Sequence, residues 1–196
     1  VDNGRGIPVD NMDIDGENCN SAVAGIRAAG GKAFAYVVDV SNRAAFMESA
    51  AKLARESGRM DAVVNNAMLL RYEPIEKVTD EVLDRMLAIG IKGSIWGAQA
   101  LLAHMDVERG GAIINMASQA ATVALDQHVA YCASKFGVVG LSKVLAAEWA
   151  GRGVRVNTIS PTVVLTELGH KAWDGPRGDA LKKLIPTGRF AYPNEI

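Results

Sequence analysis

The feature of this sequence that most constrains its fold is an alternation of short apolar runs with longer segments of helical periodicity. The runs are continuously apolar or rich in β-branched residues, as expected for strands buried on both faces. Strands are predicted over 34–39, 61–65, 112–117 and 154–159, and helices over 43–57, from Thr79 onward, over 91–105 and over 130–150. This order predicts an α/β fold with a doubly wound parallel sheet and helices on both faces.

The composition limits the class of partner. The 196 residues, 49% of them hydrophobic, suffice for one buried core, so a single domain over 1–196 is expected. With 21 basic and 22 acidic residues the net charge is −1, which argues against nucleic acid and favours a small neutral molecule. No run approaches the roughly 20 apolar residues of a membrane span. The N-terminus lacks a secretory pattern, so a cytoplasmic location away from membranes is expected. Two cysteines and three histidines, all scattered, predict no metal site.

The segment 161–193 differs in composition from the rest of the chain. Glycine and proline interrupt it repeatedly, and only 179–184 has a short helical pattern. Segments of this kind often border binding clefts. We therefore expect 161–193 to form a substrate flap within the domain.

The chemistry of the chain centres on a tyrosine and a lysine. Tyr131 and Lys135 are four residues apart in a helical pattern, so their side chains share one helix face. A free tyrosine has a pKa near ~10, and a neighbouring ammonium favours the phenolate. On spacing alone a chance pair is the better explanation, but Ser118 directly follows a predicted strand, where parallel-sheet enzymes display reactive groups. Its hydroxyl would hold a substrate oxygen while Tyr131 takes the proton and hydride leaves for a nicotinamide.

Several motifs, in their order and spacing, resemble the short-chain dehydrogenase/reductase family along nearly the whole chain. They are Ser118, the run Tyr131-Cys132-Ala133-Ser134-Lys135, Arg155-Val156-Asn157, Ser160-Pro161, Asn65-Asn66-Ala67 and Asp39-Val40. The resemblance is closest to NAD-dependent polyol dehydrogenases of that family. It implies a Rossmann-type sheet, a nicotinamide cofactor and a homo-oligomer, either a tetramer or a dimer.

The resemblance also implies a role for each matched residue. Tyr131 would be the general base, Lys135 would lower its pKa and bind the nicotinamide ribose, and Ser118 would orient the reacting hydroxyl. The residues implied in cofactor binding are Gly4, Gly6, Asp13, Asp39, Val40, Asn65, Ala67, Tyr131, Lys135, Val164 and Thr166.

Two residues bear on the choice of cofactor. Asp13 resembles the acidic residue at the end of the family's second strand, which accepts hydrogen bonds from the ribose 2′-hydroxyl and repels a 2′-phosphate. Arg5 is a contrary indication, because a basic residue at its position accompanies NADP in parts of the family. We therefore expect NAD rather than NADP.

The chain departs from the family pattern in four ways. Pro8 leads almost directly into the next strand, which leaves no room for a crossover, so the first helix is expected to be missing. Met68 replaces a glycine of the cofactor site. Gly90 replaces the asparagine that anchors a proton relay in the family, which puts that relay in question. The last strand is also expected to be absent.

Three functions remain open at this point. The leading one is NAD-dependent interconversion of a secondary alcohol, such as a small polyol, and its ketone. The second is an NADPH-dependent carbonyl or 3-oxoacyl reductase, since the same triad works in both directions. The third is a non-catalytic or impaired relative, which the shortened N-terminus, Met68 and Gly90 motivate.

Overall fold

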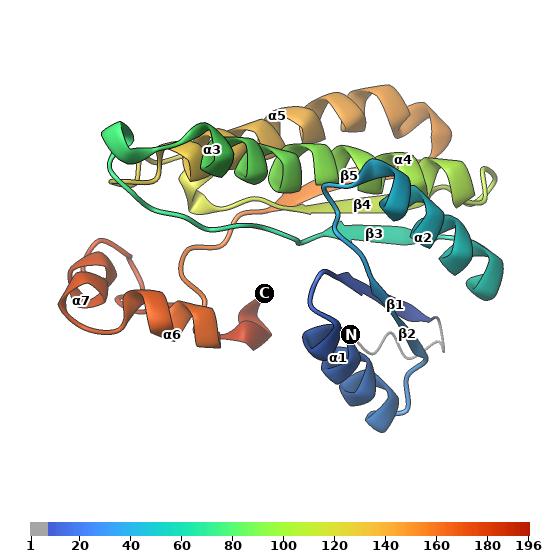
Figure 1. Ribbon diagram of the computed structural model, residues 1–196, viewed down its shortest axis with the longest axis horizontal. Helices are drawn as coiled ribbons and strands as arrows, with labels where there is room; N and C mark the ends of the chain where they lie inside the picture. Colours follow the sequence, from blue (N-terminus) through green and yellow to red (C-terminus); the bar gives the residue numbers. More distant parts are fainter. Residues whose placement is uncertain (1–7) are drawn as a thin grey trace.

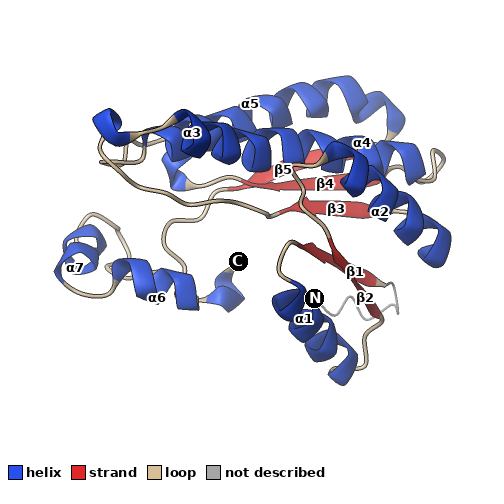
Figure 2. Ribbon diagram, in the orientation of Figure 1, coloured by secondary structure: helices blue, strands red, loops and turns tan. Residues whose placement is uncertain are grey.

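The computed structural model describes residues 8–196 and has the predicted alternation of strands and helices (Figure 2). The strands are β1 (Val9–Asp13), β2 (Ala33–Val37), β3 (Ala62–Asn65), β4 (Gly111–Met116) and β5 (Val154–Ile159). The helices are α1 (Gly16–Ala28), α2 (Arg43–Ser57), α3 (Asp80–Leu87), α4 (Gly93–His104), α5 (Val129–Trp149), α6 (Glu167–Trp173) and α7 (Pro176–Lys182). The four predicted strands are confirmed, with bounds that differ by two residues at most.

All strand pairs are parallel, but the strands form two separate sheets. One sheet has the order β1-β2, and the other has the order β3-β4-β5. Within the described residues, β1 and β3 each pair on one side only. A common apolar core nevertheless joins the sheets, since Tyr36 of β2 belongs to the same buried cluster as Leu101 of α4 and Ile113 of β4. The sequence pattern did not indicate this division.

Helices lie on both sides of the strands. α4 and α5 pack against the three-stranded sheet, and α1 packs against β1 and β2. Figure 1 shows α1 on the opposite side of the strands from α2, α4 and α5. The fold is therefore an α/β fold of the Rossmann type, with parallel strands and flanking helices. β1 starts at Val9, directly after Pro8, and the last strand in the described part is β5.

Local sequence explains where the helices begin. Asn42 caps α2 and Thr79 caps α3, because their side chains accept hydrogen bonds from Ala45 N and Val82 N. α1 was not among the predicted helices. Its Asp15 cap accepts from two backbone amides, and Cys19 lies buried against β1, where its Sγ donates to Asn11 O.

Two helical stretches, Asp80–His104 and Val129–Arg152, are long and apolar enough to cross a membrane by length and composition. Both belong to helices that pack on the β3-β4-β5 sheet. A helix buried in a protein core can have this composition too, and 44% of the first window and 28% of the second are buried.

Candidate active site

The carboxyl end of β4 carries the first reactive side chain. Ser118 follows the strand by two residues and is 8% exposed. Its Oγ accepts a hydrogen bond from Ala120 N at 3.1 Å, which fixes the start of the short turn Gln119–Ala121. The hydroxyl proton remains available for a second partner.

The first two turns of α5 bring Tyr131 and Lys135 to the same place. Lys135 Nζ lies 5.7 Å from the centroid of the Tyr131 ring. The same Nζ donates to the carbonyl oxygen of Met116, the last residue of β4, at 2.6 Å. Ser118 is close enough to Tyr131 to influence the pKa of its phenol. The structure thus places the three predicted residues around the end of one strand.

Burial is the main influence on the two titratable groups of this cluster. Burial raises the pKa of Tyr131, and the hydrogen bond with Ser118 opposes that rise only in part. The ammonium of Lys135 is directed at Met116 O. Burial lowers the pKa of Lys135 itself to about 8. The predicted lowering of the Tyr131 pKa by Lys135 stays a prediction.

Two further aromatic rings, those of His128 and Tyr72, lie beside Tyr131. The His128 ring meets the Tyr131 ring edge-on, with centroids 6.0 Å apart, and stacks on the Tyr72 ring at 5.5 Å. His128 Nδ1 lies 2.5 Å from Asp126 O, so Nδ1 is the donor of this hydrogen bond. Sequence reasoning did not single out Tyr72, because its loop is far from Tyr131 along the chain.

The residues predicted to bind the adenosine side lie at the ends of β1 and β2. Asp13 is half-buried at the end of β1, and its Oδ1 accepts from Asp15 N at 2.9 Å. Among the described residues its Oδ2 has no hydrogen-bond partner, so it has acceptor capacity for a ribose hydroxyl. Asp39 Oδ1 accepts from the backbone and the hydroxyl of Ser41, and Val40 packs against the core.

The side chain of Asn65 belongs to a hydrogen-bond network between strands and helices, whereas its predicted contact with the cofactor is through the backbone. Its Nδ2 donates to Asn115 Oδ1 at 2.7 Å and to Ser94 O at 3.2 Å, and Asn115 in turn donates to Ser142 Oγ at 2.8 Å. This buried network ties β3 and β4 to α4 and α5. Only the backbone of Asn65 is left for a ligand, and Ala67 lies exposed in the loop that follows.

The remaining predicted cofactor residues fall in two regions. Val164 forms an isolated bridge with Ala191 at the base of the flap, and exposed Thr166 caps α6 by accepting from Gly169 N at 3.2 Å. Gly4 and Gly6, like Arg5, lie outside the described residues.

The two substituted positions have clear structural settings. Gly90 is buried in the π-helical turn Ala88–Lys92, and any Cβ there would collide with Ser134 Oγ on α5. The asparagine of the family pattern would not fit here unless Ser134 moved. Met68 is 39% exposed in the loop after β3. No cluster of three or more potential metal-binding side chains was found in residues 8–196.

The residues present fit a nicotinamide dinucleotide at its two ends. Asp13 offers a carboxylate for a ribose, and Ser118, Tyr131 and Lys135 surround the place where a carbinol and a nicotinamide would meet. Because parallel strands bind such ligands outside their carboxyl ends, the position agrees with the chemistry of the side chains.

Comparison with known proteins supports this assignment. A family model described as short chain dehydrogenase matches residues 4–177. D-threitol dehydrogenase of Mycolicibacterium smegmatis is 58% identical over 192 residues, which cover 98% of this chain and 74% of that protein. NAD-dependent glycerol dehydrogenase of Listeria innocua is 44% identical over 165 residues, or 84% of this chain and 65% of the relative.

A solved structure agrees with these similarities. The short-chain dehydrogenase/reductase of Serratia marcescens aligns with a TM-score of 0.89 at 29% identity, covering 96% of this chain and 76% of that chain. The order of the motifs, the position of the site at the strand ends and the similarity to these relatives all indicate the same family. The chain belongs to the short-chain dehydrogenase/reductase family and is an alcohol oxidoreductase that acts with NAD(P).

Proposed function

We propose that the protein interconverts a secondary alcohol of a small polyol and the corresponding ketone, with NAD as the hydride acceptor. The observation that carries this proposal is the grouping of Ser118, Tyr131 and Lys135 at the end of β4. The polyol class is supported by the 58% identity to D-threitol dehydrogenase and the 44% identity to glycerol dehydrogenase.

In this mechanism the side chains hold the substrate and move one proton. Ser118 donates a hydrogen bond to the carbinol oxygen, and Tyr131 Oη, as phenolate, accepts the carbinol proton. The nicotinamide supplies the chemistry of hydride transfer when bound. Lys135 supplies positive charge near the phenol and has further N–H groups for a ribose. Since burial raises the pKa of Tyr131, oxidation of the alcohol is expected to accelerate as the pH rises above neutrality.

Asp13 supports NAD over NADP. Its Oδ2, which has no hydrogen-bond partner within residues 8–196, suits a ribose 2′-hydroxyl, and its negative charge opposes a 2′-phosphate. The name of the Listeria relative includes NAD dependence, which agrees with this choice.

A second candidate function is reduction of a carbonyl or 3-oxoacyl group with NADPH. It is favoured by the 3-oxoacyl-[acyl-carrier-protein] reductase of Thermotoga maritima, which is 34% identical over 184 residues. Lower identity than that of the two polyol dehydrogenases makes it the weaker candidate.

The decisive assay follows NADH formation at 340 nm with D-threitol, glycerol and a simple secondary alcohol. We expect turnover with the polyols and NAD, and a loss of about a thousandfold in Tyr131→Phe. Tyr36→Phe is the matched control, since it removes a phenol of β2 whose hydroxyl donates to Glu56 of α2 instead. Retained turnover in Tyr131→Phe would refute the assignment of the base. Faster ketone reduction with NADPH would favour the second candidate, and absence of any turnover would favour a non-catalytic relative.

The proposal extends to assembly and location. Val129, Phe136 and Val144 are large apolar residues of α5 that are about half exposed, and such a patch favours contact with a second copy of the chain. We propose a homo-oligomer, which light scattering on the purified protein would test. A cytoplasmic location is proposed with it, to be checked by cell fractionation.

A further inference from the structure

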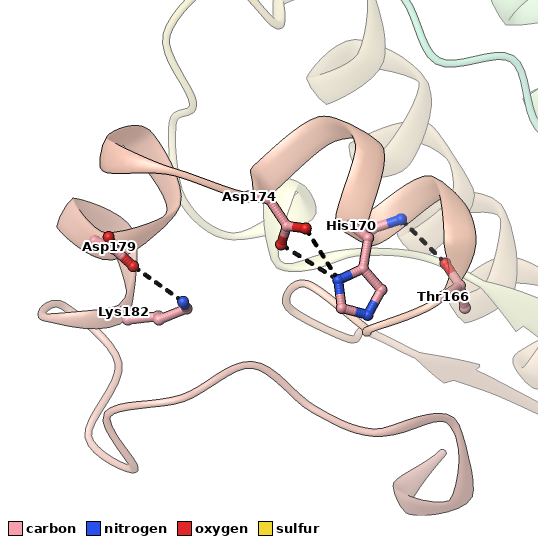
Figure 3. A network of polar contacts seen from close by, with 6 residues as sticks. Thr166, His170, Asp174, Asp179 and Lys182 are labelled. Carbon is pink, nitrogen blue, oxygen red and sulfur yellow. Dashed lines mark hydrogen bonds and ion pairs between the residues drawn. The ribbon is translucent and has the colours of Figure 1, made fainter.

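The flap, residues 161–193, makes most of its polar contacts within itself. His170 pairs with Asp174 along α6, and Lys182 pairs with Asp179 along α7 (Figure 3). Neither helix packs extensively on another helix or strand. The position of the flap over the rest of the protein therefore depends on a small number of contacts.

Arg177 makes one of these contacts, between the flap and the loop that follows β3. Its guanidinium carbon lies 4.7 Å from the centroid of Trp173 in α6 and 5.4 Å from the centroid of Tyr72. A guanidinium stacks favourably on aromatic faces. Because Tyr72 belongs to the loop after β3, this side chain links α7 to a segment more than a hundred residues earlier in the chain.

The contact continues from Tyr72 to the reactive phenol. Tyr72 stacks on His128 with an interplanar angle of 20°, and His128 meets Tyr131 at 70°. Arg177, Tyr72, His128 and Tyr131 thus form a continuous row of side chains from the flap to the proposed base.

The inner part of this row is fixed in place. His128 is 3% exposed, and Glu73 N donates to Gln127 O at 2.8 Å, which ties the two loops together. Gln127 has a φ of 61°, a strained conformation for a residue with a side chain, and such strain persists only where surrounding contacts hold it. The outer end, where exposed Arg177 meets Tyr72, is the part free to separate.

We propose that Arg177 is a positioning residue, which holds the flap closed beside Tyr131 by stacking between Trp173 and Tyr72. The consequence for catalysis rests on the proposed function, since it requires Tyr131 to be the base. If substrate binds productively only to the closed form, the apparent KM is the intrinsic value divided by the closed fraction, so KM rises as that fraction falls. The saturated rate changes little, because bound substrate restores closure.

The first test measures flap closure without any turnover. Hydrogen–deuterium exchange over 167–182 is compared in the wild type, Arg177→Ala, Arg177→Lys and Lys183→Ala. Lys183 is the matched control, an exposed cation of the same flap with no aromatic partner in the described residues. We expect exchange to quicken about fivefold in Arg177→Ala, less in Arg177→Lys, and not in Lys183→Ala.

The second test separates positioning from a general loss of structure. In Arg177→Ala we expect the KM for the polyol to rise about fivefold while kcat stays within twofold of wild type. Tyr72→Ala should raise KM at least as much, since it also removes the stack on His128, and the double variant should have a KM no higher than that of Tyr72→Ala, because the Arg177–Tyr72 contact is already lost.

The outcomes distinguish the two proposals. The proposed role of Arg177 is overturned if hydrogen–deuterium exchange over 167–182 is no faster in Arg177→Ala than in Lys183→Ala. It is also overturned if the rise in KM caused by Arg177→Ala adds fully to the rise caused by Tyr72→Ala. If the wild type turns over no alcohol, the proposed function fails, and the exchange measurement alone decides whether Arg177 holds the flap.

Discussion

Replacement of Lys135 by methionine should raise the stability of the protein near neutral pH while it removes activity. Methionine keeps an unbranched stem of similar length but carries no charge. Burial lowers the pKa of Lys135 from its ordinary value of 10.5 to about 8. Each pKa unit corresponds to about 1.4 kcal/mol, so holding the ammonium in this site at pH 7 costs roughly 3 kcal/mol of unfolding free energy.

The pH dependence gives the sharpest form of this prediction. The unfolded chain binds the lysine proton more tightly than the folded protein does, so the cost is fully present below pH 8 and is relieved as the pH rises toward 10.5. Between pH 7 and pH 10 the wild type should therefore gain about 2.5 kcal/mol relative to Lys135→Met. At pH 7 the variant should be more stable by only about 1 kcal/mol, because Met116 O loses its donor.

Urea unfolding followed by circular dichroism at several pH values would measure both quantities. Lys52→Met is the control, since the side chain of Lys52 is 60% exposed and its curve should run parallel to that of the wild type. The reasoning is refuted if the Lys135→Met and wild-type curves are also parallel, because the ammonium would then not be penalised by burial.

Three further predictions concern the site and its support. Gly90→Ala should lower the unfolding free energy by about 1–3 kcal/mol, because the added methyl group collides with Ser134 Oγ. In urea unfolding, the double variant Gly90→Ala/Ser134→Ala should recover most of that loss. If it recovers none, this contact is not the cause. Asn115→Ala should cost about 2–3 kcal/mol because Asn65 and Ser142 lose a buried partner, whereas Asn157→Ala at an exposed position should cost little. Asp13→Asn should raise the ratio of kcat/KM with NADPH to that with NADH at least tenfold, or about 1.4 kcal/mol, and an unchanged ratio would remove Asp13 from cofactor selection.

Much of the fold could be predicted because its signals are local. The strand Val154–Ile159 was predicted with its observed bounds, and α5 was displaced by one residue. A continuous apolar run of six residues and a long periodic helix need little tertiary context. α1 could have been found, because Asp15 is a good cap and Cys19 and Val23 are one turn apart.

Other parts of the fold depend on contacts between distant segments. The division of the strands into two sheets is a matter of which edges meet, and strand patterns carry no information about their neighbours. Gly90 of the π-helical turn Ala88–Lys92 lies against Ser134 of α5. The turn therefore depends on packing between helices and not on local helix propensity. The helix predicted over 179–184 lies at Pro176–Lys182, where proline at its start marks the better boundary.

Some features of the candidate site could be predicted from local sequence, and others depend on contacts between distant segments. Spacing placed Tyr131 and Lys135 on one helix face, and the end of β4 placed Ser118 beside them. The direction of the Lys135 ammonium could not be read from spacing, because it depends on a carbonyl of β4. Tyr72 and Arg177 were not predicted for the same reason: each meets its partner only through the tertiary fold.

The separation of β1-β2 from β3-β4-β5 has a consequence for heat stability. Asp13 belongs to the smaller sheet, and Ser118 and Lys135 follow or contact the larger one, so a dinucleotide touching all of them would act as a crosslink between the two. Without it, no strand pair within residues 8–196 joins the smaller sheet to the larger, so the smaller sheet should melt first. Scanning calorimetry should then show two transitions that merge into one as the dinucleotide concentration rises.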